Sequence, residues 1–437
     1  MMKDMKIFSK LMVSFVHISK LFLSILIANI VYAQNSFGEA QDMLEKSGRW
    51  GDYYVRDLNN NFNLVSSDLI VDSLFFSGDG LINKVTLLRL FHTIKGSPTK
   101  NIALSRFKNV IDGNKFINNQ STISFARFNK NYVAAVIDVT NDFKSNIGGI
   151  IGSNRDASGR WSIKGELNLR LENIFKNASR VHLQWQQPSQ SFRYIYFDLS
   201  LPVFFQMPFG VQSNFSHEFF DKNYLKSIAK GYLTKIGPYG RWKIGSSVEH
   251  IKDLVKSESI VSKGLSLGIE GDRRNDRWIP FSGSHWNLQI DARNYKDNLG
   301  STHEVNSKTL LGVYKNFFTG VLYLKTQGSF NRVQDRSLLP AKKILFGGSN
   351  DLRGYNENQF LSDWFIINTI ETILTTQSQS QLFVFIDQLF ANDLTINPTS
   401  GFGIRLFNGS QFFDVTFAFP GSKIKDGKLH IKFNTSL

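Results

Sequence analysis

The sequence predicts an all-β transmembrane barrel of about 16 antiparallel strands, preceded by a small α+β domain. Three observations support this prediction. The first residues form an export signal, no later segment is apolar for long enough to form a membrane-spanning helix, and apolar and polar residues alternate from residue 141 to the end. The 437-residue chain is therefore divided into a signal peptide (1–33), a polar N-terminal segment (34–67), an α+β domain (68–140) and a barrel (141–437).

The export signal begins with four lysines, of which Lys3 is the first and Lys20 the last. A mostly apolar run from Leu21 to Val31 follows them, and small residues at Val31 and Ala33 precede the predicted cut between Ala33 and Gln34. An N-terminal membrane anchor is the alternative. It is disfavoured because the apolar run is about half the length of roughly 20 residues that a spanning helix needs.

Composition narrows the functional classes. There is no cysteine, so the chain has no lipoprotein anchor, disulfide or thiolate metal site. The net charge is +15, of which the leader contributes three, and the basic residues are spread along the chain. This spread favours lipopolysaccharide phosphates or a water-filled lumen over nucleic acid as their surroundings. Enzyme signatures are absent and the eight histidines are scattered, so we expect no enzyme, metal or cofactor.

Residues 68–140 show the pattern of a small α+β domain. The expected order is a strand, two helices and two strands, over 68–76, 83–95, 101–111, 120–128 and 132–139. This order resembles a POTRA domain, and Asp72–Asp79 is similar to the opening strand and glycine turn of that family. The resemblance implies a periplasmic domain that receives unfolded protein; another small α+β domain is the alternative. The segment 34–67 is compatible with a short helix over 38–46 and indicates no role.

From residue 141 onward, apolar and polar side chains alternate over long stretches. In one such stretch Trp286, Leu288, Ile290 and Ala292 alternate with Asn287, Gln289, Asp291 and Arg293. Period two over about nine residues or more is typical of transmembrane strands. Alternation does not tell which face meets water, so a soluble periplasmic β-protein that binds an apolar ligand stays open. The export signal, the strand lengths and aromatics near the strand ends (Trp161, Tyr232, Trp242, Trp364) favour the membrane.

The most specific motif is Leu345-Phe-Gly-Gly-Ser-Asn-Asp-Leu-Arg-Gly-Tyr355. It resembles the loop signature of the BamA/TamA-type barrels of the bacterial surface antigen superfamily, which are related to two-partner secretion transporters. The resemblance implies a long loop whose tip, Arg353-Gly354-Tyr355, folds back into the lumen. Gly354 allows a close turn, and Gly347 and Gly348 let the loop leave its strand sharply.

An arginine held inside a barrel needs a carboxylate partner, and its planar fork binds one bidentately. The family pattern implies Glu371 and Asp387 as these partners. Asp387 lies on the face opposite Leu382, Val384 and Ile386, as a lumenal carboxylate should. Glu371 shares its face with Phe365 and Ile367, so its orientation is ambiguous, and ordinary lumenal polarity remains the alternative for both carboxylates.

Another segment matches the same family more loosely. Asp272–Gly283 resembles a turn of this family, and Asp272, Pro280 and Gly283 are the residues that match the family pattern. It reads Pro-Phe-Ser-Gly where the family has Pro-Thr-x-Gly. The first barrel strand contains Gly148, Gly149 and Gly152, and the last strand, 428–437, turns Ile431 and Phe433 outward. Since glycine weakens strand pairing, we hypothesise a lateral seam between these strands. The alternative is that the glycines ease curvature.

The resemblance implies an outer-membrane barrel that mediates protein translocation across, or insertion into, the bacterial outer membrane. Its expected partners are an unfolded or exported protein, outer-membrane lipid and lipopolysaccharide, and accessory periplasmic or assembly-machinery proteins, but no nucleic acid. Room for one POTRA-like copy favours a specialised relative over the general assembly factor. A passive channel or structural barrel is the alternative function.

Overall fold

The computed structural model describes residues 37–437 except 57–61, 66, 130–131, 156–160, 206, 208, 238, 318–319, 378, 393 and 422–423. The predicted signal peptide and its cleavage site at Ala33 and Gln34 lie outside this part of the chain. Within it, no helix is both long and apolar enough to cross a membrane. The chain forms two compact units, and the larger one contains the whole barrel.

A small α/β region precedes the barrel. It comprises α2 (Phe37–Ser47), β1 (Tyr53–Arg56), β2 (Phe62–Val65), β3 (Val71–Gly78), α3 (Lys84–Leu90), η1 (His92–Ile94), α4 (Lys100–Gly113), β4 (Thr122–Asn129) and β5 (Tyr132–Val139). From β3 onward this is the expected order, and the sheet order is β3-β5-β4. Helix α3 begins where the Asn83 side chain accepts a hydrogen bond from the Thr86 N–H at 2.8 Å, the usual N-cap contact. The hairpin of β1 and β2 was not expected from the sequence.

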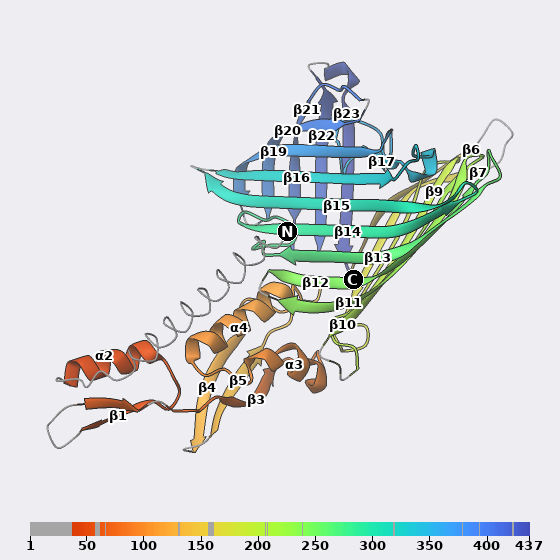
Figure 1. Ribbon diagram of the computed structural model, residues 1–437. Coiled ribbons are helices and arrows are strands. Elements are labelled where there is room, and N and C mark those ends of the chain that lie inside the picture. The colour runs from red at the N-terminus through yellow and green to blue at the C-terminus, as the bar shows by residue number, and fades with distance from the viewer. Residues whose placement is uncertain are drawn as a thin grey trace, which may run out of the picture. The chain divides into compact units, whose positions relative to one another are not determined.

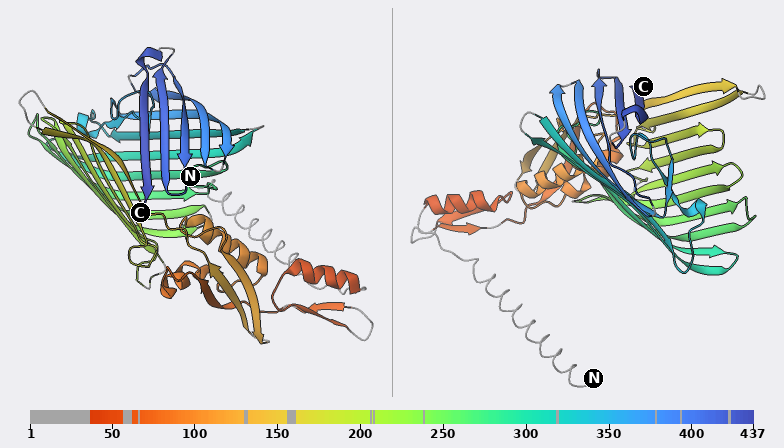
Figure 2. Two further views of the ribbon diagram at one scale, coloured as in Figure 1. Left: turned by 180° about the vertical axis from the view of Figure 1, so that it is seen from behind. Right: turned by 90° about the horizontal axis from the view of Figure 1, so that it is seen from above.

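The barrel closes with 16 antiparallel strands, as the sequence predicted (Figures 1 and 2). They are β6 (Asn146–Arg155), β7 (Trp161–Glu172), β8 (Arg180–Ser189), β9 (Phe192–Leu201), β10 (Gly210–Phe220), β11 (Tyr224–Gly237), β12 (Gly240–Asp253), β13 (Ser259–Asp272), β14 (Gly283–Asp297), β15 (Gly300–Phe317), β16 (Gly320–Val333), β19 (Trp364–Gln377), β20 (Ser380–Ala391), β21 (Thr399–Phe407), β22 (Gln411–Pro420) and β23 (Lys428–Ser436). Each strand pairs with its neighbour in sequence, and β23 returns to β6.

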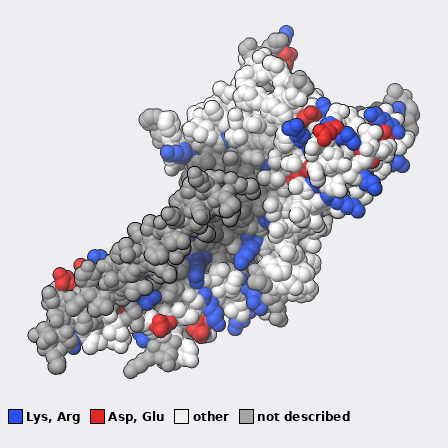
Figure 3. Space-filling model, in the orientation of Figure 1, with Lys and Arg blue, Asp and Glu red and all other residues white. Residues whose placement is uncertain are grey.

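The two faces of the wall are reversed relative to a soluble barrel. On β14, Leu288 and Ile290 point outward and are 37% and 56% exposed, whereas Asp291 and Arg293 point inward and are 0% and 5% exposed. The part of the outer wall seen in Figure 3 is largely free of charged side chains. An apolar outside with a polar inside is stable only in lipid, so the soluble alternative is wrong and the barrel spans a membrane. Tyr232, expected near the membrane interface, instead faces the lumen, where its hydroxyl lies 3.0 Å from that of Ser266.

One long loop, residues 334–363, connects β16 to β19, and eleven strands of the barrel, β6 to β16, precede it. It contains the short helix η2 (Pro340–Lys342) and a two-stranded ribbon of β17 (Ile344–Phe346) and β18 (Phe360–Ser362). The tip between the ribbon strands carries the Arg353 motif. We call this segment loop 334–363 below.

Candidate functional site in the barrel lumen

Loop 334–363 packs inside the barrel through its apolar residues. Phe346 and Leu352 are fully buried, and the Phe346 ring stacks on Phe365 of β19 with centroids 4.4 Å apart. This contact explains why Phe365 and Ile367 share the lumenal face with Glu371: the loop covers them. Glu371 therefore points into the lumen, and it is 1% exposed.

Three glycines of the motif have backbones that other residues rarely adopt. Gly348 has φ +100°, and a Cβ there would lie 2.2 Å from the Glu357 carboxyl carbon. That carboxylate accepts a hydrogen bond from the Ser349 N–H at 2.6 Å and so closes the tip. Gly354 has φ +89° and passes 3.4 Å from the main chain of β22, measured from the position a Cβ would take. Gly347 also has a positive φ, +113°.

Arg353 lies between two carboxylates on neighbouring strands. Its Nε and Nη2 donate to the Asp387 carboxylate of β20 at 2.9 and 2.8 Å, and its Nη1 donates to Glu371 of β19 at 3.0 Å. The guanidinium carbon lies 3.3 Å from the ring centroid of Phe385. The fork geometry and the aromatic face fit arginine and would not fit lysine.

A second arginine extends this group. Arg405 of β21 donates to Glu371 at 2.6 Å and to Asp414 of β22 at 3.2 Å. We call Arg353, Asp387, Glu371, Arg405 and Asp414 the Arg353 cluster. It connects the loop tip to four consecutive strands, and removing one partner from such a buried group costs about 3–5 kcal/mol. Neither Arg405 nor Asp414 was singled out from the sequence, because nothing in their local motifs distinguishes them from other lumenal charges.

The loop tip also touches the last strand. The Gly354 N–H donates to Nε2 of His430 at 3.1 Å, and the Lys432 ammonium donates to the Ser349 oxygen at 2.9 Å and to Asn350 at 2.8 Å. Tyr355 packs edge-on against Phe360, with centroids 4.8 Å apart. The tip thus links β19 and β20 to β23.

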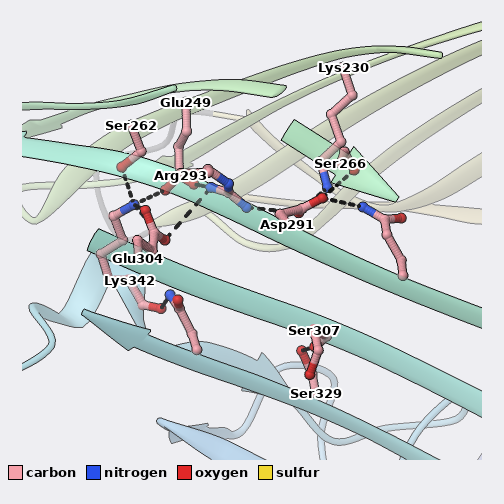
Figure 4. Close-up of polar contacts among 12 residues, drawn as sticks. Lys230, Glu249, Ser262, Ser266, Asp291, Arg293, Glu304, Ser307, Ser329 and Lys342 are labelled. Carbon is pink, nitrogen blue, oxygen red and sulfur yellow. Dashed lines mark hydrogen bonds and ion pairs between the residues drawn. The ribbon is translucent and has the colours of Figure 1, made fainter. Parts of the chain in front are cut away.

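A separate group of charges holds the root of the loop. The Lys342 ammonium, 1% exposed, lies 2.8 Å from Glu304 and 3.1 Å from Glu249, and it donates to the Ser262 hydroxyl at 2.8 Å. Figure 4 shows Arg293 beside the same carboxylates; it pairs with Glu249 and also with Asp291. Lys230 completes the group at 2.7 Å from Asp291.

We call Lys342, Glu304, Glu249, Arg293, Asp291 and Lys230 the Lys342 cluster. The charges of its three cations and three carboxylates cancel, so the cluster is neutral as a whole. In the sequence, Asp291 and Arg293 stand out only as polar members of an alternating strand. The cluster could not be recognised there, because its members come from β11, β12, β14, β15 and the loop.

The turn motif enters the lumen from the other end of the strands. Asp272 accepts from Nε and Nη2 of Arg274 at 2.9 and 2.7 Å, and the Pro280 oxygen accepts from Gln381 of β20 at 2.8 Å. Gly283 has φ +99°, and a Cβ there would lie 2.1 Å from the Arg273 oxygen, so glycine is required. This turn and the loop tip line one cavity of about 270 Å³. The structure therefore brings the two motifs to opposite sides of one space.

The seam between β23 and β6 is short. Only three residue pairs join these strands, Asn434 with Gly148, Thr435 with Ile147 and Ser436 with Asn146, whereas β14 and β15 share fifteen. A Cβ on Gly148 would lie 2.3 Å from the Phe433 oxygen, so this glycine lets the strands approach.

The other expected seam residues lie outside these three pairs. Gly149 and Gly152 pair with β7, and Ile431 and Phe433 pair with β22. Within the described residues there is no group of side chains suited to a metal ion.

Neither a protein-family model nor a curated protein sequence matches the chain. Solved structures do match. BamA from Haemophilus ducreyi lacking POTRA domains 1–3 has a TM-score of 0.50 at 13% identity, covering 91% of this chain and 92% of that chain. The barrel has the BamA-type fold. CdiB from Acinetobacter baumannii and CdiB from Escherichia coli have TM-scores of 0.59 and 0.60 at 14% and 11% identity, and they cover 91% of this chain and 80% and 83% of theirs. The BamA-type fold that the resemblance of Leu345–Tyr355 implied is therefore confirmed.

Proposed function

We propose that this barrel transports polypeptides: it receives unfolded protein and passes it across, or inserts it into, the bacterial outer membrane. The observation that carries the proposal is loop 334–363, fastened inside the lumen by the Arg353 cluster. Buried ion pairs stabilise little after their desolvation cost, so a passive pore gains little from them. Buried ion pairs suit a loop that must be held in one defined position and must also be able to leave that position. BamA and CdiB are transport or assembly barrels rather than enzymes, which supports the same class.

The α/β region is the proposed receiving site. Its sheet order, β3-β5-β4, leaves β3 and β4 at the edges. An edge strand offers unpaired main-chain groups to which an extended polypeptide adds as a further strand. We therefore propose that residues 68–140 act as a POTRA-like domain in the periplasm. Accessory periplasmic or assembly-machinery proteins are proposed as further partners at the same edges.

The seam is the proposed exit for inserted substrates. Its three pairs make it the weakest joint of the closed sheet. Lys432 and His430 of β23 hold the loop tip, so the tip and the seam strand move together in this proposal. Outer-membrane lipid is the proposed partner of the apolar outer wall, and lipopolysaccharide phosphates are proposed to meet basic side chains of the barrel.

Replacing Arg353 with Ala tests the proposal. We expect impaired export or insertion of substrate proteins, measured by comparing outer-membrane proteomes, while the barrel still assembles and migrates as a folded, heat-modifiable band. Arg336→Ala is the matched control, because Arg336 lies in the same loop but forms a partly exposed pair with Asp297 at 3.5 Å. Unaltered proteomes in both variants would favour the passive channel.

A further inference from the structure

A second lumenal cavity, about 650 Å³, lies beside the root of loop 334–363. Among its lining residues Lys and Arg outnumber Asp and Glu by nine to four. The loop borders it through Lys342 and Lys343, and the strands β7 to β16 supply the remaining wall. The cavity therefore has a surplus of positive charge.

The carboxylates in this wall are already engaged. Glu249 belongs to the Lys342 cluster, and Glu270 of β13 accepts from Lys243 at 2.5 Å. Asp198 of β9 lies 3.6 Å from Arg180, and Glu218 accepts a hydrogen bond from Tyr224. Three of the four carboxylates are thus paired with cations, and Glu218 is hydrogen-bonded to a neutral phenol.

Three of the cations lack a carboxylate contact. Lys226 of β11 donates to the main-chain oxygen of Ala341 at 2.9 Å. Within the described residues, the side chains of Lys308 of β15 and Arg170 of β7 form no hydrogen bond and no ion pair, although both line the cavity. Cations gathered in a concave, low-dielectric space raise the local concentration of anions.

The neutral part of the wall suits a peptide. Strands β8 and β10 contribute amides to the wall, and β9 between them contributes phenols; these residues are Gln184, Gln186, Gln212, Asn214, Tyr194 and Tyr196. Each amide offers both donors and an acceptor, the groups that a main chain in extended form needs. An ordinary anion would use the cations alone, whereas an extended acidic segment would use both sets.

We infer that this cavity binds acidic segments of the polypeptide in transit. The inference rests on the proposed function and names the chemical class of its substrate: extended chain rich in Asp and Glu. Lys226, Lys308 and Arg170 contact the carboxylates, and the amide and phenol groups contact the main chain. The Lys342 cluster is neutral as a whole, and without its members the wall still has six Lys and Arg against three Asp and Glu.

The test uses the purified full chain in detergent, free of lipopolysaccharide. Binding of a fluorescent peptide rich in Glu and Ser is measured by anisotropy, beside the same peptide with Lys in place of Glu. We expect the acidic peptide alone to bind, more weakly as salt rises. The Lys226→Glu/Lys308→Glu variant should bind it about tenfold more weakly, because like charges then face each other. Lys308→Gln, expected to be intermediate, serves if the double variant does not fold.

Lys256→Glu is the matched control, since Lys256 lies in the turn after β12 and outside the cavity. Equal binding of both peptides, no binding, or an unaltered affinity in the double variant would overturn the inference. Displacement of the acidic peptide by low inorganic phosphate would also overturn it, in favour of a phosphate-bearing ligand. Peptide binding is measured without export, so retained binding together with normal export in Arg353→Ala would contradict the proposed function and leave the cavity's preference intact.

Discussion

Lys342→Met is predicted to release the root of loop 334–363. The Lys342 ammonium contacts Glu304 at 2.8 Å and Glu249 at 3.1 Å and is 1% exposed, so its loss leaves one buried carboxylate uncompensated. Breaking a buried pair from one side costs about 3–5 kcal/mol. If this cost falls on the closed position of the loop, the detached population rises on the order of 100-fold or more, since each 1.4 kcal/mol is tenfold.

Limited trypsin digestion measures this population. Lys343 follows Lys342 and remains in the variant, and the rate of cleavage after it reports the fraction of detached loop when reattachment is fast. Mass spectrometry separates this cut from cuts at Arg336, which is partly exposed. Lys296→Met, on the exposed face of β14, is the control and should leave the rate unchanged.

A second substitution tests the physical reason. Lys342→Met/Glu304→Gln removes one cation and one carboxylate and restores the charge balance of the Lys342 cluster. We expect it to regain much of the protection lost in Lys342→Met. A single variant as protected as the native chain, or a double variant cleaved faster than the single, would refute the argument that uncompensated charge is what releases the loop.

Three further predictions follow from the contacts. Asp387→Asn should reduce export as strongly as Arg353→Ala in the proteome comparison, because the bidentate pair is lost in both; normal export would contradict this. Gly283→Ala should destabilise the barrel by about 1–3 kcal/mol in urea unfolding, owing to its positive φ and the nearby Arg273 oxygen; an unchanged midpoint would contradict it. Gly148→Ala should lower the temperature at which the folded band is lost, with Gly152→Ala outside the three seam pairs as its control, and equal temperatures would contradict it.

The architecture could be predicted from the sequence because the same physical constraint acts on every strand of a closed barrel. Lipid outside and water inside force period-two alternation on every strand, so the barrel, its strand number and the position of the long loop could all be predicted. The Arg353 motif could be found because its residues are adjacent in the chain. Its partners Glu371 and Asp387 could be proposed because the family pattern implies carboxylates on the two strands that follow the loop.

The Lys342 cluster could not be predicted from sequence patterns. Glu249, Arg293 and Glu304 come from three different strands, and their contacts depend on strand stagger and on where η2 enters the lumen. Alternation predicts only that such side chains face inward. Which lumenal cation meets which carboxylate is decided by register between strands, and no local pattern in the sequence encodes that.

The apolar residues that break the alternation contain more information than the sequence analysis drew from them. On β19, Phe365 and Ile367 face the lumen because loop residue Phe346 covers them. At the loop root the same holds for a set of lumenal residues packed against Leu338 and Leu339, namely Tyr224, Ile251, Ile260, Tyr295 and Val333. An apolar side chain facing a water-filled lumen would be unfavourable, so each such residue marks a place where another part of the chain packs. The ambiguous orientation of Glu371 was thus itself a sign that the loop lies against β19.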